Sequence, residues 1–275
     1  MNQERKAELK KQANEVRKGI VTAVHSAKSG HPGGSLSAAD ILTYLYFEEM
    51  NIDPQDPKKA DRDRLVLSKG HIAPALYSVL SHRGYFPTSD LTTLRHTGSY
   101  LQGHPDMKHI PGVDMSSGSL GQGLSAAVGM ALNAKLDNSD YRVYAVCGDG
   151  EIQEGQIWEA AMFAASRKLD NLTVFVDNNN LQIDGPIDQV CSPYPIDEKF
   201  AAFGFHVINI DGHNFDEIEA AVNEAKATKG QPTAIIAKTV KGKGVSFMEN
   251  QCGWHGKAPN DEEFEQALKD LEVTE

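Results

Sequence analysis

The chain has 275 residues, of which 40% are hydrophobic and 24% are charged, a composition typical of a globular protein and unlike that of a disordered one. Its 27 basic and 38 acidic residues give a net charge of −11, which argues against nonspecific nucleic-acid binding. No apolar run approaches the roughly 20 residues of a membrane span. The first residues do not resemble a secretory signal, and the three cysteines have no paired spacing. We therefore expect a cytoplasmic metabolic protein without a disulfide framework or a thiolate zinc site.

Apolar residues recur at helical spacing over residues 3–29, and this pattern predicts an amphipathic helix. The Gly-His-Pro-Gly-Gly run at 30–34 forbids its continuation, so a second helix is expected over 37–47. The charged, proline-containing stretch 51–64 is predicted to be a loop. The N-terminal quarter of the chain is therefore expected to be helical.

From residue 64 onward, predicted strands and helices alternate. The strands are expected at 64–68, 142–147, 172–176, 206–210 and 233–238, and the helices at 74–83, 124–135, 153–168 and 215–227. The region 84–119 is irregular, and loops of that length are usually functional or disordered. Repeated strand–helix–strand units predict an α/β fold, with a parallel sheet and helices on both faces. No linker marks a second domain, so residues 1–275 are predicted to form a single one.

Polar residues follow two consecutive predicted strands. Gly148-Asp149-Gly150 ends one strand, and Asp177-Asn178-Asn179-Asn180 ends the next. One crossover helix spans the interval, so both groups should lie at the same edge of the sheet, where such folds bind ligands. A carboxylate and an amide oxygen there suit Mg²⁺ or Ca²⁺, with phosphate oxygens completing the shell. A Gly-Asp-Gly run alone is more often a tight turn, and only the joint arrangement favours a metal site.

This arrangement resembles the thiamine-diphosphate enzymes, specifically the N-terminal part of transketolase. The resemblance covers essentially the whole chain, because further motifs of that family occur in order: Ser29-Gly30-His31-Pro32-Gly33, Leu67-Ser68-Lys69-Gly70-His71, Gly103-His104-Pro105, Gly118-Ser119-Leu120-Gly121-Gln122-Gly123 and Gly253-Trp254-His255-Gly256. It implies a thiamine-diphosphate-binding fold of the pyrophosphate-binding type.

The resemblance also implies a ligand set. Asp149, Asn179 and the backbone carbonyl of Leu181 would hold Mg²⁺, for which Ca²⁺ or Mn²⁺ could substitute. The metal would bridge the two phosphates of thiamine diphosphate. The implied cofactor contacts are His71, Gly118, Ser119, Leu120, Asp149, Gly150, Asn179, Ile183 and His255. Some family members have proline where this chain has Ser119, which leaves that one contact open.

Four histidines directly follow a glycine, namely His31, His71, His104 and His213. A histidine near a turn is more often structural than catalytic. In the family, however, protons move on and off sugar hydroxyls, a task that suits imidazole. The resemblance implies that His31, His104 and His255 face the substrate and are catalytic.

The helix after Asp149 carries two acidic residues and an apolar stripe. Glu154 and Glu159 could compensate the helix dipole, which is a sufficient role for Glu159. The family alternative is an acidic network at the dimer interface, and for Glu154 both interpretations stay open. Trp158, Met162 and Phe163 share helical spacing and are expected in the core or in an interface.

The family reaction transfers a two-carbon ketol unit between sugar phosphates, as in the pentose phosphate pathway. It also needs a glutamate from a pyrimidine-binding domain, and the sequence contains no match to that domain or to the family's C-terminal domain. We therefore expect a split transketolase in which a separate C-terminal subunit completes an α₂β₂ assembly. The alternatives are a relative of 1-deoxyxylulose-5-phosphate synthase, the α subunit of a 2-oxoacid dehydrogenase, or a non-catalytic cofactor-binding paralogue. The Gly-His motifs and Trp254-His255-Gly256 favour transketolase.

Overall fold

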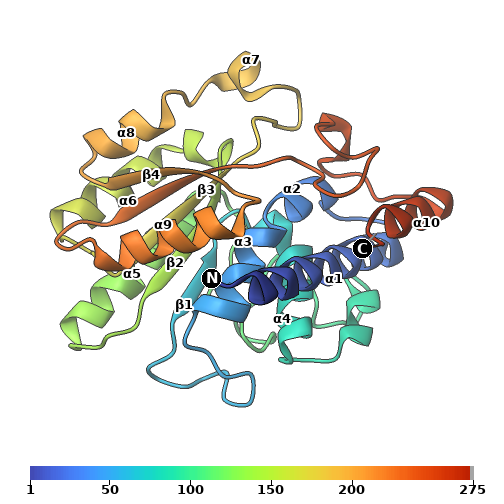
Figure 1. Ribbon diagram of the computed structural model, residues 1–275, viewed down its shortest axis with the longest axis horizontal. Coiled ribbons are helices and arrows are strands. Elements are labelled where there is room, and N and C mark those ends of the chain that lie inside the picture. The colour runs from blue at the N-terminus through green and yellow to red at the C-terminus, as the bar shows by residue number, and fades with distance from the viewer. Residues whose placement is uncertain (273–275) are drawn as a thin grey trace.

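A five-stranded parallel sheet forms the centre of the computed structural model, which describes residues 1–272 (Figure 1). In spatial order its strands are β1 (Arg64–Leu67), β2 (Val143–Gly148), β3 (Leu172–Asn178), β5 (Thr233–Lys238) and β4 (His206–Asp211). All neighbouring pairs are parallel. The five predicted strands and their parallel arrangement are therefore confirmed.

Helices cover both faces of the sheet. One face packs against α1 (Gln3–Ala27), α3 (Ala39–Tyr44), α4 (Ala73–Arg83) and α9 (Phe215–Ala227), and the other against α5 (Gln122–Leu136), α6 (Gly155–Ser166) and α8 (Ile196–Ala202). Successive strand residues point to opposite faces. In β2, Tyr144 and Val146 therefore enter the first core, whereas Ala145 and Cys147 enter the second. The predicted α/β architecture is confirmed.

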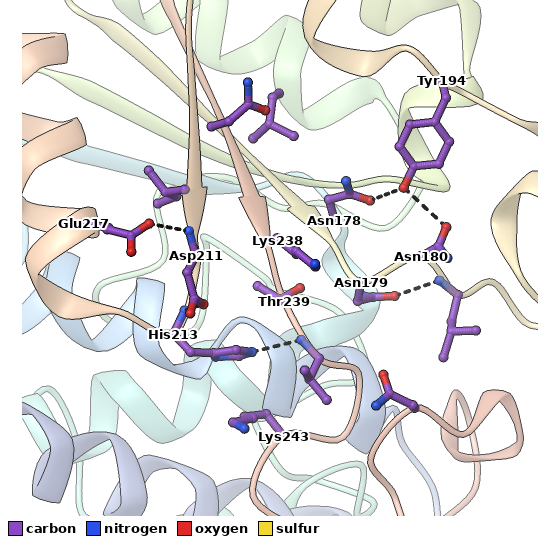
Figure 2. A pocket seen from close by; sticks show the side chains of 16 residues that line it. Asn178, Asn179, Asn180, Tyr194, Asp211, His213, Glu217, Lys238, Thr239 and Lys243 are labelled. Carbon is purple, nitrogen blue, oxygen red and sulfur yellow. Dashed lines mark hydrogen bonds between the residues drawn. The ribbon is translucent and has the colours of Figure 1, made fainter.

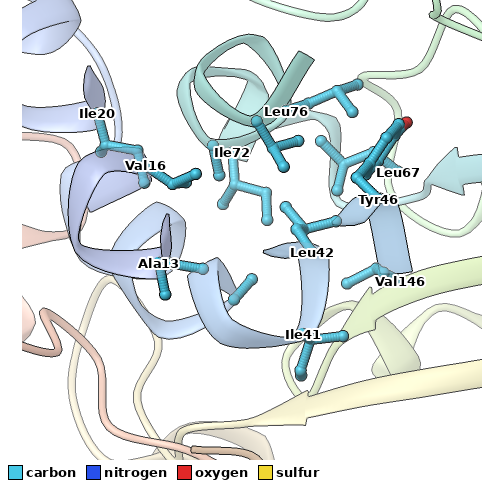
Figure 3. Packing of buried hydrophobic residues seen from close by; sticks show 14 of the residues in the cluster. Ala13, Val16, Ile20, Ile41, Leu42, Tyr46, Leu67, Ile72, Leu76 and Val146 are labelled. Carbon is cyan, nitrogen blue, oxygen red and sulfur yellow. The ribbon is translucent and has the colours of Figure 1, made fainter. Parts of the chain in front are cut away.

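The first core is built around α1 (Figure 3). Ala13, Val16 and Ile20 recur every three or four residues, so they share one face of the helix, and all three are fully buried. Figure 3 shows them directed toward Ile72 and Leu76, which lie at and just after the start of α4. The predicted amphipathic helix is thus confirmed, with its end at Ala27.

The helix expected over 37–47 begins earlier and is divided. The chain forms α2 (Pro32–Ser37), then α3, and then a π-helical turn over Leu45–Glu49. The expected start at residue 37 was wrong, because Pro32 lies in the first turn of α2. A proline at that position costs little, since the first amides of a helix have no partner inside it. The Gly-His-Pro run that ends α1 therefore also begins α2.

Three short helices were not predicted: α7 (Ile187–Cys191), α8 and α10 (Asp261–Asp270). The start of α10 carries a capping box between Asn260 and Glu263, a signal that the sequence does contain. The expected helix 153–168 is shorter, because Glu151–Gln153 form a 3-10 turn before α6. Within residues 1–272, the structure contains no helix of the length and apolarity that a bilayer crossing requires.

Candidate functional site

The carboxyl ends of β2 and β3 meet at one edge of the sheet, as expected. Gly148 lies opposite Asp177 in the register, so Asp149 directly follows one strand end, and Asn178 and Asn179 follow the neighbouring one. The two Asp149 carboxylate oxygens accept hydrogen bonds from the backbone N–H of Gly150, at 2.8 Å, and of Asn180, at 2.6 Å. The second bond joins the two strand ends directly. The side-chain oxygen of Asn179 accepts the N–H of Leu181 at 3.2 Å.

Asp149 is buried in a way that disfavours its charge. Burial, and then the nearby charge of Asp177, raise the pKa of Asp149 to about 6, although backbone hydrogen bonds and Lys69 oppose the shift. Within residues 1–272 its carboxylate makes no ion pair. No group of three or more His, Cys, Asp or Glu side chains among the described residues could hold a metal ion. A cation beside Asp149 would therefore draw on amide, carbonyl and ligand oxygens, which are ligands that Mg²⁺ accepts.

A buried polar cluster supports the end of β3. The Asp177 carboxylate is fully buried, forms an ion pair with Lys69, and accepts hydrogen bonds from Ser37 and Thr239. Burial opposes its ionisation, but Lys69 and the two hydroxyls outweigh that cost and hold the pKa of Asp177 below its usual value. The cluster ties the ends of β1, α2 and β5 to the strand that precedes Asn179. Asp177 and Lys69 lie within the motifs quoted from the sequence, but neither of them was expected to have a role in the site.

Three of the expected site histidines converge from distant parts of the chain. The ring centroids of His31 and His71 are 5.1 Å apart, those of His31 and His255 5.2 Å, and those of His71 and His255 5.3 Å. Burial is the main cause that lowers the pKa of His31 to about 4, of His71 to about 2 and of His255 to about 3. All three rings are therefore neutral at pH 7.

Lys241 joins this group and was not predicted. Its side chain is almost fully buried, and its ammonium group donates to the Leu181 carbonyl at 3.2 Å and contacts Nδ1 of His255 at 2.9 Å. Because an ammonium can only donate, Nδ1 of His255 accepts and its proton lies on Nε2. Burial, and then the charge of Lys69, lower the pKa of Lys241 to about 8. A buried cation thus lies beside one of the expected metal ligands.

These groups line a cavity of about 290 Å³ at the edge of the sheet. The expected site residues in its wall are His31, His71, Gly118, Leu120, Asp149, Gly150, Asn179, Leu181, Ile183 and His255. The wall also contains Gly34, Lys69, Gly148, Glu151, Gln182 and Lys241, none of which was among the expected contact residues, although Lys69 and Gly148 belong to the quoted motifs. The predicted grouping of residues from five separate motifs is therefore present in the fold.

Two expected site residues do not line this cavity. Ser119 is exposed, next to Gly118 and Leu120. The His104 ring lies beside Gly118, where an added Cβ would be 3.2 Å from the ring. His104 therefore lies next to a residue of the cavity wall without lining the cavity itself.

The acidic side chains after Asp149 occupy different environments. Glu151 is buried and clamps the turn, because its carboxylate accepts the backbone N–H groups of Gly121 and Gly148. Glu154 is the exposed N-cap residue of α6, a position that fits the dipole interpretation, and its side chain makes no cap hydrogen bond. Glu159 is also exposed. The acidic interface network stays a prediction.

A larger open cleft of about 1160 Å³ lies on the other side of the Asn178–Leu181 segment (Figure 2). Its lining includes Lys238, His213 and Asp211, and it contains none of His31, His71 and His255. Asn179 and Leu181 line both spaces, so this one segment separates the cleft from the histidine cavity.

Comparison with known proteins identifies the family. Residues 9–274 match the family "Transketolase, thiamine diphosphate binding domain". The chain is 48% identical to the 6-deoxy-6-sulfo-D-fructose transketolase subunit SqwG of a Clostridium strain, covering 98% of each chain. It is 42% identical to an apulose-4-phosphate transketolase subunit of Phocaeicola vulgatus, covering 96% of this chain and 93% of the other.

Solved structures give the same assignment. The crystal structure of transketolase from Campylobacter jejuni superposes with a TM-score of 0.91 at 36% identity, covering 98% of this chain and 43% of that one. The chain thus spans less than half the length of that transketolase, but nearly the whole length of the two relatives that are named as subunits. These matches select transketolase from the thiamine-diphosphate enzyme classes that the sequence left open. The chain belongs to the transketolase family of transferases and corresponds to its N-terminal, thiamine diphosphate binding domain.

Proposed function

We propose that this chain is the cofactor-binding subunit of a two-chain transketolase and that it binds Mg²⁺-thiamine diphosphate in the 290 Å³ cavity. One observation carries the proposal: a buried carboxylate without an ion pair among residues 1–272, two neutral oxygens and three neutral imidazoles converge on that cavity in a chain of this family.

The donor set fits a hard divalent cation. Asp149 supplies a buried carboxylate without an ion pair among residues 1–272, and Asn179 and the Leu181 carbonyl add neutral oxygens from the adjacent strand end. Mg²⁺ is the metal we propose, with Ca²⁺ or Mn²⁺ as possible substitutes. The Lys241 ammonium adds a positive charge close to the place where the cofactor's phosphates would lie.

The remaining wall suits the rest of the cofactor. Gly150 and His71 would contact the diphosphate, and Gly118, Ser119 and Leu120 would contact the aminopyrimidine. Ile183 is 66% exposed in the segment after Leu181, so it is free to pack on the cofactor. The backbone at Gly118 has φ +159°, and its missing side chain leaves room for the neighbouring His104 ring.

Thiamine diphosphate, when bound, supplies the carbon that breaks and forms carbon–carbon bonds in the transfer of a two-carbon ketol unit from a ketose phosphate to an aldose phosphate. The contribution of this chain is to hold protons near that reaction. Neutral His31 can accept a proton from a sugar hydroxyl or donate a hydrogen bond to it, and we assign the same role to His104. His255 can donate a hydrogen bond from Nε2, because its Nδ1 accepts one from Lys241. Since burial lowers the pKa of His31 to about 4 and of His255 to about 3, both rings are neutral at pH 7.

The second half of the site would come from a partner. We propose that a separate C-terminal subunit supplies the pyrimidine-binding domain, in an α₂β₂ assembly, while residues 1–275 form one cofactor-binding domain. The relatives named as transketolase subunits support this proposal, because they match this chain over nearly their whole length. Two of them are named for a sulfonated ketose and for apulose 4-phosphate, so we propose an anionic ketose as donor. We place the assembly in the cytoplasm.

Calorimetry on the complex reconstituted with the partner subunit tests the metal assignment. Thiamine diphosphate should bind only when Mg²⁺ is present, and Asp149→Ala should abolish this uptake because it removes the charged ligand. Asp137→Ala, at an exposed aspartate at the end of α5, is the matched control and should bind as the unmodified protein does. Metal-independent uptake, or full uptake by Asp149→Ala, would refute the assignment.

An activity assay on the same material tests the two-chain proposal. Ketol transfer should appear when both subunits are mixed and be negligible with this chain alone. Comparable turnover by the purified chain alone would contradict the need for a partner. Tight cofactor binding without transfer in the complete complex would instead identify a non-catalytic paralogue.

A further inference from the structure

His213 is a glycine-linked histidine that the proposed function does not use. It lies between β4 and α9, its side chain is only 13% exposed, and both ring nitrogens have partners. Nδ1 is 2.7 Å from the Asp40 carboxylate, and Nε2 is 2.9 Å from the backbone nitrogen of Val240. Figure 2 shows the ring directed at the main chain that follows Thr239.

The two partners define one protonation state of the ring. The Val240 N–H can only donate, so Nε2 must be unprotonated, and the Asp40 carboxylate then accepts the proton on Nδ1. Asp40 is itself buried beside Arg17, which donates to the same carboxylate. Burial opposes the charge of Asp40, but Arg17 and the His213 hydrogen bond outweigh it and keep the pKa of Asp40 below its usual value. The carboxylate is therefore always available to orient His213.

Val240 is the residue before Lys241, whose ammonium group lies in the wall of the 290 Å³ cavity. The backbone N–H of Thr239 bonds to the Asn178 carbonyl at 3.1 Å, and that of Gly242 bonds to the Gly33 carbonyl at 2.9 Å. Between these two anchors, the Lys241 carbonyl accepts the Asn250 N–H at 2.9 Å, and the His213 ring accepts the Val240 N–H, so the ring holds the main chain directly before Lys241.

There is little tolerance for movement in this segment. An added Cβ at Gly33 would be 3.0 Å from the Lys241 side chain and 2.8 Å from the Trp254 carbonyl oxygen. The Lys241 stem is therefore packed directly against the backbone at the start of α2. A shift of Val240 would displace the ammonium from Leu181 and from His255 together.

We propose that His213 is a positioning residue for the cofactor site: by accepting the Val240 N–H it fixes the segment Thr239–Gly242, and through it Lys241. Arg17 and Asp40, from α1 and α3, hold the ring in the tautomer that can accept this bond. The proposal rests on the proposed function, because it takes Lys241 to lie beside the bound cofactor.

Two substitutions separate the two ring contacts. His213→Gln places a side-chain oxygen near the position of Nε2, so it can still accept the Val240 N–H but gives up the bond to Asp40. His213→Asn places an amide near the position of Nδ1, so it can still donate to Asp40 but leaves Val240 without an acceptor. The pair is matched in polarity and in loss of the ring.

The readouts are the affinity of the reconstituted complex for thiamine diphosphate at saturating Mg²⁺, the hydrogen exchange of residues 239–242, and the melting temperature without cofactor. His213→Asn should weaken cofactor binding roughly five- to tenfold and speed exchange in that segment. His213→Gln should stay within about twofold of the unmodified protein in both, even if its melting temperature falls as far as that of His213→Asn. Equal weakening in the two variants, or none in either, would overturn the proposal.

Nitrogen NMR on the unmodified chain, labelled at histidine, supplies an independent test that needs no variant to fold well. His213 should show an unprotonated Nε2 and a protonated Nδ1 at pH 7, and the opposite tautomer would overturn the proposal. Cofactor uptake by the unmodified complex distinguishes failure of the proposed function from failure of the role of His213. If the unmodified complex takes up no cofactor, the proposed function fails, whereas the tautomer and the exchange at 239–242 still decide the role of His213.

Discussion

The burial of His71 makes the stability of the chain depend on pH. Its pKa is lowered to about 2, first by burial and then by the charge of Lys69. In the unfolded chain a histidine titrates near 6.5. Below that pH the unfolded state binds a proton at His71, whereas the folded state does not. The contribution of His71 to the free energy of unfolding is therefore highest above pH 6.5 and decreases as the pH falls. His31 and His255 act in the same direction.

Buried carboxyl groups oppose this trend. Burial raises the pKa of Asp114 and of Asp149 to about 6, and it also raises the pKa of Asp63 and Glu151. Between pH 4 and 6 the folded state therefore holds protons that the unfolded state has released, and stability rises as the pH falls through this window. The pKa of His104 and that of the ion-paired Asp177 are lowered, so these groups act with the three histidines, and acidification should have a net destabilising effect on the cofactor-free chain.

His71→Gln should therefore flatten the pH dependence of stability. Between pH 7 and pH 5 the free energy of unfolding of the variant should fall by about 1–2 kcal/mol less than that of the unmodified chain. The reason is that glutamine does not bind a proton in the unfolded state, as His71 does. Urea unfolding of the cofactor-free chain at both pH values measures this difference. His109→Gln, at a ring that is 68% exposed, is the matched control. An unchanged pH dependence in His71→Gln would show that the buried imidazole does not carry the effect.

The residues that the sequence missed show what a linear pattern does not reveal. The rule that ligands bind beyond the carboxyl ends of strands indicated Asp149 and Asn179, and it applies equally to Lys69 after β1 and Lys241 after β5. A lysine after a strand is, however, usually exposed. Nothing local marks these two of the 27 basic residues as buried, because their burial depends on Asp177, Leu181 and His255 from other segments.

At the scale of elements, α5 contains one glycine that its packing requires, Gly123, and one that it does not, Gly129. An added Cβ at Gly123 would be 2.5 Å from the Cα of Ser68, so the helix can approach the end of β1 only without a side chain there. At Gly129, on the exposed part of the same helix, an added Cβ would meet nothing within 4 Å. The sequence shows that this segment is rich in glycine and alanine, which favours close packing, but it does not show which glycine makes the contact.

The two alanine substitutions should have opposite signs. Gly123→Ala forces backbone apart and should destabilise the chain by about 1–3 kcal/mol, as overpacking does. Gly129→Ala should stabilise it by about 0.5–1 kcal/mol, because glycine inside a helix costs that much relative to alanine. Denaturant unfolding of both variants decides the matter, and destabilisation of equal size would mean that α5 is not held to β1 through Gly123.

The helices and strands were predictable where the apolar pattern of the sequence agreed with the residues that begin and end such elements. The long helices follow from apolar periodicity. The strands follow from short continuous apolar runs, since the sheet is covered on both faces and residues of both orientations are buried. The short helices α7 and α8 are too brief to show a period, and they are positioned by packing such as that of Phe200 against Trp158, with ring centroids 5.1 Å apart. α10 is different, since its capping box is a local signal that the sequence does carry.

At the scale of the molecule, α6 presents an apolar surface to solvent. Trp158 is packed against α8, but Met162 is 61% exposed and Phe163 is 40% exposed. We expected this stripe in the core or in an interface. Trp158 faces inward, whereas Met162 and Phe163 face outward. Exposed large apolar side chains on one helix are typical of an interaction surface.

Phe163→Glu should therefore weaken assembly without unfolding the chain. A charge placed in an apolar contact costs several kcal/mol, so the reconstituted complex should dissociate at least tenfold more readily in sedimentation velocity runs. Phe163→Leu keeps the apolar contact and should assemble nearly as the unmodified protein does. Assembly of the glutamate variant at unchanged affinity would place the subunit contact elsewhere on the molecule.

The meeting of His31, His71 and His255 also has a consequence for biosynthesis. The ribosome releases the first two histidines early, whereas the third follows only after all five strands have been translated. A nascent polypeptide can therefore assemble much of its α/β scaffold while one wall of the pocket is still missing. If the coenzyme binds in this pocket as proposed, it can be loaded only after His255 has been translated, and products terminated before that residue would be scaffolds that never become holoenzyme.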